Sequence, residues 1–329
     1  MLKILVVGYG SIGKRHIKNL RNFQNIKIII LTKRKLDNFL KEEECQIVNS
    51  IDDAIKEKPD AALITNVTSE HVDIGLKLAK LGIHLFIEKP LSNSFKKINQ
   101  LEKIVKKEKI ISQIGCNLRF HPCIKKIREL IVKEIIGKHF SVIVENGSYL
   151  PDWHPYENYK KSYAANEEKG GGVILTNIHE IDYLYWFFGK VNEVTAISGR
   201  ISKLGIKAED YSSIILKFNK NIMAEIHFDY FQRPSFRGCK IIGEKGTIIW
   251  DFEKNNVIVY NIKKKKWKTH LKLKNYDNNI MYINEIEHFL NCIKQNKNTI
   301  NDIQEGIKVL KIALGIKKSA LVKRTVQIK

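Results

Sequence analysis

A glycine turn at the start of the chain constrains the fold more than any other feature. Residues 8–13 read Gly-Tyr-Gly-Ser-Ile-Gly, directly after the apolar run 2–7 and directly before residues 14–20, whose apolar positions have helical spacing. A strand, a glycine turn and a helix in this order form the opening βαβ unit of a dinucleotide-binding sheet. A glycine-rich strand-to-helix turn without a ligand is the alternative interpretation.

Each glycine of this turn has a separate physical task. Gly8 permits the tight turn, Gly10 lets the backbone approach a pyrophosphate, and Gly13 lets helix and strand pack closely. The amides at the start of the following helix would face the phosphates. The residues expected to hold the dinucleotide here are Gly8, Gly10, Ser11, Ile12 and Gly13.

The end of the second expected strand, residues 26–31, indicates which dinucleotide binds. An NAD site usually has an Asp or Glu there, which accepts from the ribose 2′-hydroxyl. This chain continues instead with Thr32, Lys33 and Arg34, followed by a further lysine. A hydroxyl and cations suit a 2′-phosphate, so the sequence favours NADP over NAD. The alternative is that the cations are solvated loop residues and the backbone holds an NAD ribose.

Composition narrows the class of protein. The chain has 329 residues, 43% of them hydrophobic and 28% charged, and a formal net charge of +22. Length and hydrophobic content suit two globular domains. The lysines are spread along the chain and form no stripe interleaved with aromatics, so we expect no specific nucleic-acid partner, although the positive field would attract anionic substrates.

Cysteine usage and hydropathy indicate the compartment. The five cysteines are odd in number and scattered, without the spacing of metal ligands, so we expect free thiols and no metal. The N-terminus enters a strand at once, which leaves no room for a signal peptide. No apolar stretch approaches 18 residues without a charge. These features predict a cytoplasmic protein with no membrane partner.

The pattern of apolar and polar residues changes near residue 118. Up to that point strands and helices alternate, which predicts an α/β fold with a doubly wound parallel sheet over residues 1–118. Within it we expect helices at 35–44, 51–56, 71–81 and 94–107. Residues 119–329 contain long period-two segments, one helix at 174–188 and two terminal helices at 281–295 and 303–322, typical of an α+β domain on an open, mainly antiparallel sheet.

The tripeptide Glu88-Lys89-Pro90 directly follows an expected parallel strand. Ligands of such sheets bind beyond the carboxyl ends of the strands. A lysine there, partly desolvated and next to a cationic nicotinamide, would have its pKa lowered and could exchange protons near neutral pH. The alternative is an ordinary Glu-Lys surface pair at a strand end.

Five motifs in the same order resemble those of the Gfo/Idh/MocA family of nicotinamide-dependent oxidoreductases. They are the glycine turn, Thr65-Asn66 with His71 behind it, Glu88-Lys89-Pro90, residues 115–122 (Gly-Cys-Asn-Leu-Arg-Phe-His-Pro), and Gly170-Gly171-Gly172 leading to His179-Glu180-Ile181-Asp182. The resemblance covers essentially the whole chain. It implies an N-terminal Rossmann domain and a C-terminal α+β domain with an open sheet.

The resemblance also implies roles. Lys89 would be the catalytic lysine and touch the nicotinamide ribose, and His179 would accept the proton from a substrate hydroxyl as hydride leaves its carbon. The alternative for His179 is a satisfied core histidine. Further cofactor-binding residues expected from the motifs are Thr65, Asn66, His71, Glu88 and Asn117.

The chain departs from the family pattern before His179. The family carries an Asp a few residues earlier, whereas Thr176 is its nearest counterpart here. Either Thr176 and Asn177 supply the hydrogen bonds of that Asp, or Asp182 holds the imidazole. Because of this departure, a catalytically silent dinucleotide-binding regulator or sensor of the same fold is an alternative to an enzyme.

Residues 149–156 and Tyr163 suggest a sugar substrate. Their aromatic and imidazole groups can stack on a sugar ring and bond its hydroxyls; a loop packed on the sheet is the alternative. The expected substrate contacts are Arg119, Trp153, His154 and Tyr163. The resemblance implies a sugar or nucleotide-sugar dehydrogenase, with C3 of a UDP-linked N-acetylhexosamine in surface-polysaccharide or amino-sugar biosynthesis as a candidate. An open sheet with an apolar face also predicts a homodimer or homotetramer through that sheet.

Overall fold

The computed structural model describes residues 1–33, 45–155 and 157–328 and divides them into two compact units. The first unit contains Met1–Asn117 and Asn279–Lys308, and the second contains Leu118–Asn278 and Val309–Lys329. Arg34 and the helix expected at 35–44 lie outside the described residues.

A six-stranded parallel sheet forms the centre of the first unit. Its spatial order is β3-β2-β1-β4-β5-β6, the order of a Rossmann sheet. The strands are almost continuously apolar because both faces are covered. Their bounds are β1 (Leu2–Val7), β2 (Ile26–Leu31), β3 (Gln46–Val48), β4 (Ala61–Ile64), β5 (His84–Glu88) and β6 (Ser112–Gly115).

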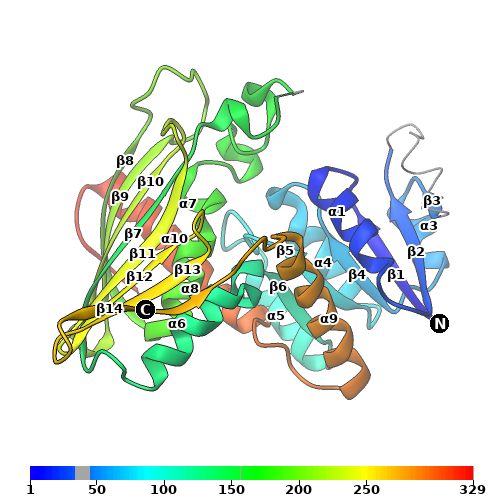
Figure 1. Ribbon diagram of the computed structural model, residues 1–329. Coiled ribbons are helices and arrows are strands. Elements are labelled where there is room, and N and C mark those ends of the chain that lie inside the picture. Colours follow the sequence, from blue (N-terminus) through cyan, green and yellow to red (C-terminus); the bar gives the residue numbers. More distant parts are fainter. Residues whose placement is uncertain (34–44, 156, 329) are drawn as a thin grey trace. The chain divides into compact units, whose positions relative to one another are not determined.

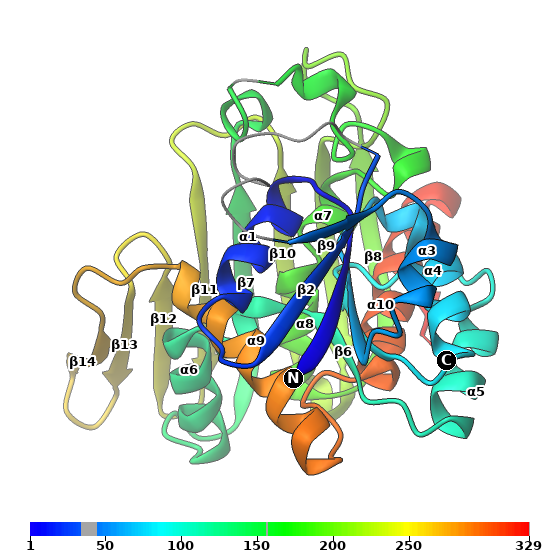
Figure 2. The same ribbon diagram turned by 90° about the vertical axis from the view of Figure 1, so that its right-hand side faces the viewer.

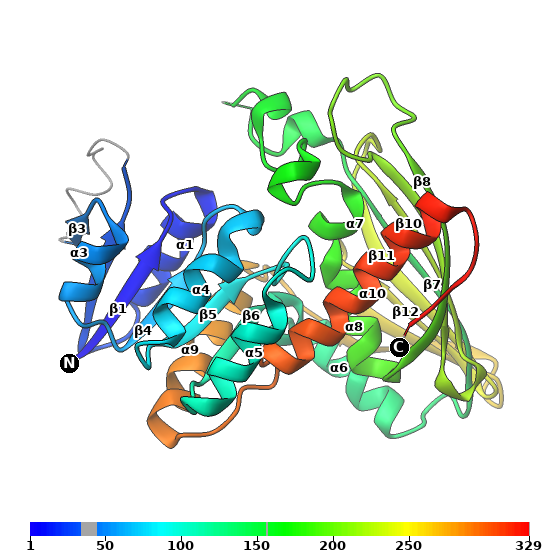
Figure 3. The ribbon, with the colours of Figure 1, turned by 180° about the vertical axis from the view of Figure 1, so that it is seen from behind.

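Helices cover both faces of this sheet. Figures 1 and 3 show α1 and α9 on one face and α4 and α5 on the other. The helix expected at 94–107 begins only at Ile98, after a left-handed Lys97. The bounds are α1 (Ser11–Leu20), α3 (Ile51–Lys56), α4 (His71–Ala79), α5 (Ile98–Lys107) and α9 (Asn279–Gln295).

Helix α9 belongs to the first unit, although the sequence placed the second domain at 119–329 without interruption. Ile286, Phe289 and Leu290 of α9 join the buried cluster that contains Ile4 and Phe86. An amphipathic pattern indicates that a helix needs an apolar partner but not which sheet supplies it. The boundary between the two units therefore depends on contacts between residues far apart in the chain, such as Phe86 and Phe289.

The second unit is built on a nine-stranded sheet in the order β14-β13-β12-β11-β7-β10-β9-β8-β15. Figure 2 shows this order from β14 to β8. Neighbouring strands are antiparallel except for the parallel pair β7 and β10. The predicted fold class, a parallel α/β sheet followed by a mainly antiparallel open sheet, is confirmed. The bounds are β7 (His139–Gly147), β8 (Val191–Gly199), β9 (Tyr211–Phe218), β10 (Met223–Asp229), β11 (Phe236–Gly243), β12 (Gly246–Asp251), β13 (Asn256–Asn261), β14 (Lys266–Lys272) and β15 (Val326–Gln327).

Helices pack on one face of the nine-stranded sheet. They are α6 (Pro122–Val132), α7 (Val173–Thr176), α8 (Ile178–Phe188) and α10 (Ile303–Val322). Within the part of the chain that the structure describes, no helix lies on the opposite face (Figures 1 and 3). The single helix expected at 174–188 is interrupted at Asn177, whose φ of −93° and ψ of 29° are not helical.

The remaining described helical elements are short 3₁₀ turns. The 3₁₀ segments are Thr68–Glu70, Asn117–Phe120, Leu150–Asp152, Tyr159–Lys161, Glu167–Lys169 and Asn219–Asn221. All five cysteines have free thiols. Among the described helices, none combines the length and the apolar character that a membrane crossing requires.

Candidate functional site

The glycine turn between β1 and α1 has the geometry of a phosphate-binding loop. Gly8 has a φ of +104°, and a Cβ on Gly13 would lie 2.3 Å from the Gly8 carbonyl oxygen, so a side chain at either position would strain or block the turn. A Cβ on Gly10 would meet no described heavy atom within 4 Å, which leaves room on that side of the loop. The first turn of α1 has no acidic residue that would oppose an anion. These features fit a dinucleotide pyrophosphate.

The end of β2 provides two of the residues expected near the adenosine ribose. Thr32 is buried, with its amide bonded to the Val48 carbonyl, and Lys33 is exposed. Neither residue is a carboxylate, so the described part of this strand end lacks the acceptor typical of an NAD site. Arg34, the third residue of the expected set, lies outside the described residues.

Two polar residues beyond β4 brace the backbone. The Thr65 hydroxyl bonds to the carbonyl oxygens of Val7 and Gly8, at 3.0 and 3.1 Å. The His71 ring lies between the carbonyl oxygens of Pro90 (Nδ1, 2.9 Å) and Asn66 (Nε2, 3.1 Å). Burial lowers the pKa of His71, although the hydrogen bonds to the two carbonyls act to raise it. These hydrogen bonds therefore fix the segments that follow β1, β4 and β5 at the carboxyl edge of the sheet.

Two buried amide oxygens at this edge lack an internal partner. Oδ1 of Asn66 and Oδ1 of Asn117 are buried and accept no hydrogen bond from the described residues. Asn66 follows β4 and Asn117 follows β6, so both lie beyond carboxyl ends of the same parallel sheet. Buried acceptors without partners are uncommon, and a bound ligand with hydroxyl or amide donors would satisfy them.

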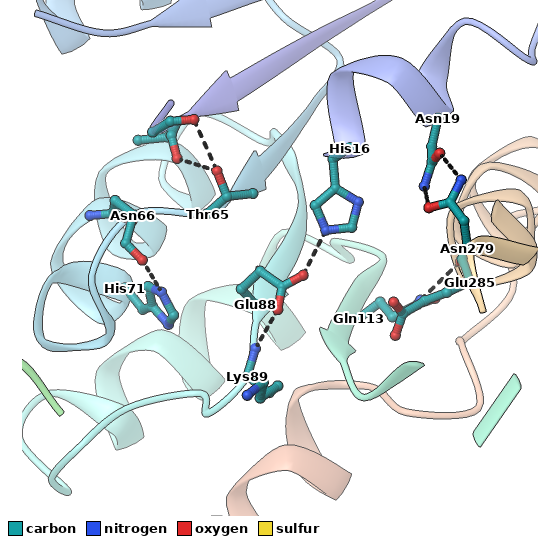
Figure 4. A network of polar contacts seen from close by, with 12 residues as sticks. His16, Asn19, Thr65, Asn66, His71, Glu88, Lys89, Gln113, Asn279 and Glu285 are labelled. Atoms are coloured by element: carbon teal, nitrogen blue, oxygen red, sulfur yellow. Dashed lines mark hydrogen bonds and ion pairs between the residues drawn. The ribbon is translucent and has the colours of Figure 1, made fainter. Parts of the chain in front are cut away.

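Glu88, the last residue of β5, is held from two sides (Figure 4). Its Oε1 lies 2.6 Å from Nε2 of His16 on α1, and its Oε2 accepts from the backbone amide of Lys89 at 3.2 Å. Both side chains of the pair are buried. His16 was not among the residues predicted from the sequence. Its place on the buried face of α1, next to Ile17, could have indicated a histidine with a buried partner.

In the second unit, His179 lies in the first turn of α8, directly after the break at Asn177. Thr176, Asn177 and His179 are all buried, with exposed fractions below 9%. The glycine run before them turns through positive φ at Gly170 and Gly172. The expected catalytic histidine and two of its expected supporting residues thus lie buried around one helix break.

Arg119 and Asp182, expected as a substrate contact and as a support of His179, form a buried pair. The Arg119 Nε donates to Oδ2 and its Nη2 to Oδ1 of Asp182, both at 2.8 Å. Both side chains are at most 1% exposed. Arg119 and Asp182 thus neutralise each other in the interior, and their expected roles, Arg119 as a substrate contact and Asp182 as a support of the imidazole, stay predictions. On the same helix, Glu180 accepts from Arg237 at 2.6 Å.

The aromatic loop after β7 packs near Tyr230, a residue that the sequence interpretation missed. The Trp153 ring lies edge-on to Tyr230 at 5.4 Å, and its Nε1 donates to Ser148. Burial raises the pKa of Tyr230, and the Thr176 hydroxyl opposes this shift. His154 is half-buried and Tyr163 is exposed. Position alone, directly after a period-two strand, could have indicated Tyr230.

The glycine turn, the parallel sheet order and the open second sheet define a two-unit, dinucleotide-binding oxidoreductase. Family models agree over most of the chain: residues 2–116 match the oxidoreductase family's NAD-binding Rossmann fold, and residues 128–328 match its C-terminal alpha/beta domain. The chain belongs to the Gfo/Idh/MocA oxidoreductase family. The resemblance drawn from five motifs is confirmed.

Similar proteins include dehydrogenases of polyols and sugars. Myo-inositol 2-dehydrogenase of Thermotoga maritima is 25% identical and aligns over 99% of this chain and 98% of its own. The scyllo-inositol 2-dehydrogenase (NAD(+)) of Bacillus subtilis is 24% identical over 94% of this chain and 91% of its own. A solved levoglucosan dehydrogenase, in complex with NADH and levoglucosan, superposes with a TM-score of 0.88 at 16% identity over 99% of both chains, which shows the shared fold.

Proposed function

We propose that this chain transfers hydride between a nicotinamide dinucleotide and a secondary hydroxyl or ketone of a sugar or polyol. One observation carries the proposal: the glycine turn, Lys89, and the Asn66 and Asn117 oxygens that accept no hydrogen bond from the described residues all follow carboxyl ends of one parallel sheet. Ligands of such sheets bind at this edge. The names of the similar dehydrogenases support the substrate class.

The first unit would hold the dinucleotide and supply a cation. Gly8, Gly10 and Gly13 let the backbone and the amides of Ser11 and Ile12 meet the pyrophosphate. When bound, the nicotinamide supplies the hydride acceptor or donor. Lys89 would bond the nicotinamide ribose and stabilise negative charge on the substrate oxygen.

The second unit would move the proton. In oxidation, the neutral imidazole of His179 accepts the proton of the substrate hydroxyl as hydride leaves the attached carbon; in reduction it returns that proton. Thr176 and Asn177 precede His179 in the chain, and they are proposed to take the place of the family's carboxylate. Trp153, His154 and Tyr163 are proposed to contact the sugar.

We further propose NADP as the favoured dinucleotide. Thr32 and Lys33 follow β2 and supply a hydroxyl and a cation, but no carboxylate, where the 2′ position is expected. A 2′-phosphate would form charge-assisted bonds there that a bare ribose would not. The ratio of kcat/KM for NADP and NAD measures this preference, and a ratio that favours NAD would contradict it.

The substrate is proposed to be a sugar or nucleotide sugar, with C3 of a UDP-linked N-acetylhexosamine as the finer candidate. The test incubates purified protein with NAD or NADP and a panel of inositols, free sugars and UDP-sugars, and follows reduced nicotinamide by its absorbance. Turnover by wild type and its loss in Lys89→Ala are expected. If the two proteins behave alike on every active substrate, the assignment of the site fails.

A catalytically silent sensor is the second candidate, supported by the absence of a carboxylate before His179 in this sequence. Tight dinucleotide binding, without turnover on any member of the panel, would favour it. The retained Lys89 and the buried His179 favour an enzyme.

We also propose that two copies pair through the helix-free face of the nine-stranded sheet, in a cytoplasmic homodimer or homotetramer. Ile197 and Ile215 lie on neighbouring strands of that face and are 74% and 44% exposed. Apolar residues on an uncovered sheet suit self-association. Analytical ultracentrifugation of wild type and Ile215→Lys tests it, and a monomeric wild type would exclude it.

A further inference from the structure

We propose that the buried pair of His16 and Glu88 is a positioning device that couples the phosphate-facing helix α1 to Lys89. It rests on the role proposed for Lys89. His16 lies on α1, five residues after the start of the helix, whereas Glu88 ends β5. The pair therefore joins two segments that are 72 residues apart in the chain.

Hydrogen bonds make a continuous connection. His16 Nε2 lies 2.6 Å from Glu88 Oε1, and the amide of Lys89 donates to Oε2 of the same carboxylate at 3.2 Å (Figure 4). His16 is fully buried and Glu88 is 6% exposed. A buried hydrogen bond to a charged group is stronger than one in water, so the carboxylate has a fixed place from which it orients the Lys89 backbone.

The His16 ring has one polar anchor among the described residues. Its other nitrogen, Nδ1, is buried and makes no hydrogen bond to them. Phe86 and Tyr282 meet the ring edge-on, with centroids 5.2 and 6.3 Å away. Because aromatic rings enclose it, the imidazole is directed at Glu88 and offers its remaining nitrogen to no other described side chain.

The neighbouring strand leaves Glu88 just enough space. Gly115 of β6 is the partner of Glu88 in the parallel register. A Cβ at position 115 would lie 3.1 Å from both Cδ and Oε1 of Glu88. The same Cβ would lie 3.1 Å from Cε1 of Phe86, so a methyl group there requires the carboxylate or the Phe86 ring to shift by a few tenths of an ångström. The glycine is thus part of the same device.

The connection has a consequence for catalysis. The N-terminus of α1 would bind the pyrophosphate, and His16 on the same helix fixes the carboxylate that orients Lys89. The position of Lys89 is then set relative to the bound dinucleotide. Loss of the link should misplace Lys89 while the glycine turn stays intact, so chemistry should suffer more than dinucleotide binding.

The experiment compares variants on a substrate that wild type turns over and Lys89→Ala does not. His16→Leu should lower kcat about 100-fold, the effect of a small misplacement, with the dissociation constant for the dinucleotide within about threefold of wild type. His16→Gln retains an N–H donor for Glu88 and should recover at least about tenfold of the loss. Gly115→Ala, which removes no polar group, should also lower kcat more than dinucleotide affinity.

Asn19→Leu is the matched control on the same helix. Asn19 is buried and exchanges two hydrogen bonds with Asn279, but it does not touch Glu88 (Figure 4). Its variant should lose stability as His16→Leu does and keep kcat. If Asn19→Leu and His16→Leu lower kcat equally, or if His16→Gln recovers nothing, the pair is merely structural and the proposal is overturned.

A second measurement needs no substrate. In His16→Leu, the amide of Lys89 should exchange its hydrogen about tenfold faster than in wild type, the change expected for one hydrogen bond, whereas Asn19→Leu should not change it. Unchanged exchange would refute the link even if no substrate is found. If wild type turns over no substrate but the exchange of the Lys89 amide changes as expected, the result counts against the proposed function and not against the link.

Discussion

Each unit places a carboxylate close in sequence to a proposed catalytic residue, but the two carboxylates are held differently. Glu88 precedes Lys89 and is bonded by an imidazole and by the Lys89 amide. Asp182 follows His179 by three residues, and Arg119 binds both of its oxygens. A guanidinium is permanently charged, so Arg119 neutralises Asp182 at every pH, whereas the Glu88 carboxylate is bonded to the backbone of the catalytic candidate itself. Nearness in sequence to a catalytic candidate therefore goes with a different kind of partner in each unit.

The largest effect should come from removing the two proposed catalytic groups. Lys89→Ala and His179→Ala should each lower kcat/KM by about 10²–10⁴-fold, the range for general acid–base catalysis. Only Lys89→Ala should also weaken dinucleotide binding, because Lys89 is proposed to touch the ribose. Steady-state kinetics and a dinucleotide titration check this.

His227→Ala is a suitable control for His179→Ala. His227 is a half-buried histidine of the second unit that bonds Asp229 at 2.8 Å on β10. Its removal should leave kcat near the wild-type value. An equal loss of activity in both variants would point to a general effect on folding and sink the assignment of His179.

Breaking the Arg119–Asp182 pair should give the largest change in stability. Arg119→Met leaves a buried, uncompensated carboxylate and should lower the free energy of unfolding by about 3–5 kcal/mol. Replacing both residues, as Arg119→Met with Asp182→Leu, should restore most of it, because no charge is left buried. Urea denaturation measures both, and a double variant less stable than the single one would contradict this account.

A buried histidine makes the second unit sensitive to acid. Burial, with the nearby Arg237 cation, lowers the pKa of His121 to about 4, below its ordinary 6.5. As the pH falls, the unfolded chain therefore binds this proton before the folded chain does. The contribution of neutral His121 to the free energy of unfolding is complete above pH 6.5 and is lost as the pH falls toward 4. Between pH 7 and 5 the expected loss from this group is about 2 kcal/mol.

His121→Asn tests the contribution of that histidine. The His121 ring accepts from the Cys123 amide at the start of α6, and asparagine can also cap a helix there. The variant should show a shallower decline of unfolding free energy between pH 7 and 5. An unchanged slope would assign the acid sensitivity to other groups.

The smallest effect should come from an exposed ion pair in the first unit. Lys97 Nζ lies 2.6 Å from Asp73 Oδ1 at the surface. Asp73→Asn should change the free energy of unfolding by less than about 1 kcal/mol, because water screens exposed charges. The difference in free energy of unfolding between wild type and Asp73→Asn should shrink further in 1 M salt. If Asp73→Asn lowered that free energy by as much as Arg119→Met does, the contrast between buried and exposed pairs would be wrong.

Local patterns were sufficient to predict much of this fold. The glycine turn, the alternating strands and helices up to residue 118 and the period-two segments beyond it identified both sheets. The same reading placed the expected cofactor residues Thr65, Asn66 and Lys89 beyond strand ends. Such signals are readable because each depends on residues close together in the chain. The helix break at Asn177 escaped them, since nothing in the apolar spacing of residues 174–188 marks it.

The sequence by itself determined the class of fold, the glycine turn and the candidate pair of Lys89 and His179. Only the tertiary structure decided that α9 packs with the first unit, that Arg119 neutralises Asp182 and that His16 holds Glu88. The reason is physical. Periodicity and local motifs reveal that a side chain is buried, but a buried polar group is defined by its partner, and these partners lie 63 and 72 residues away.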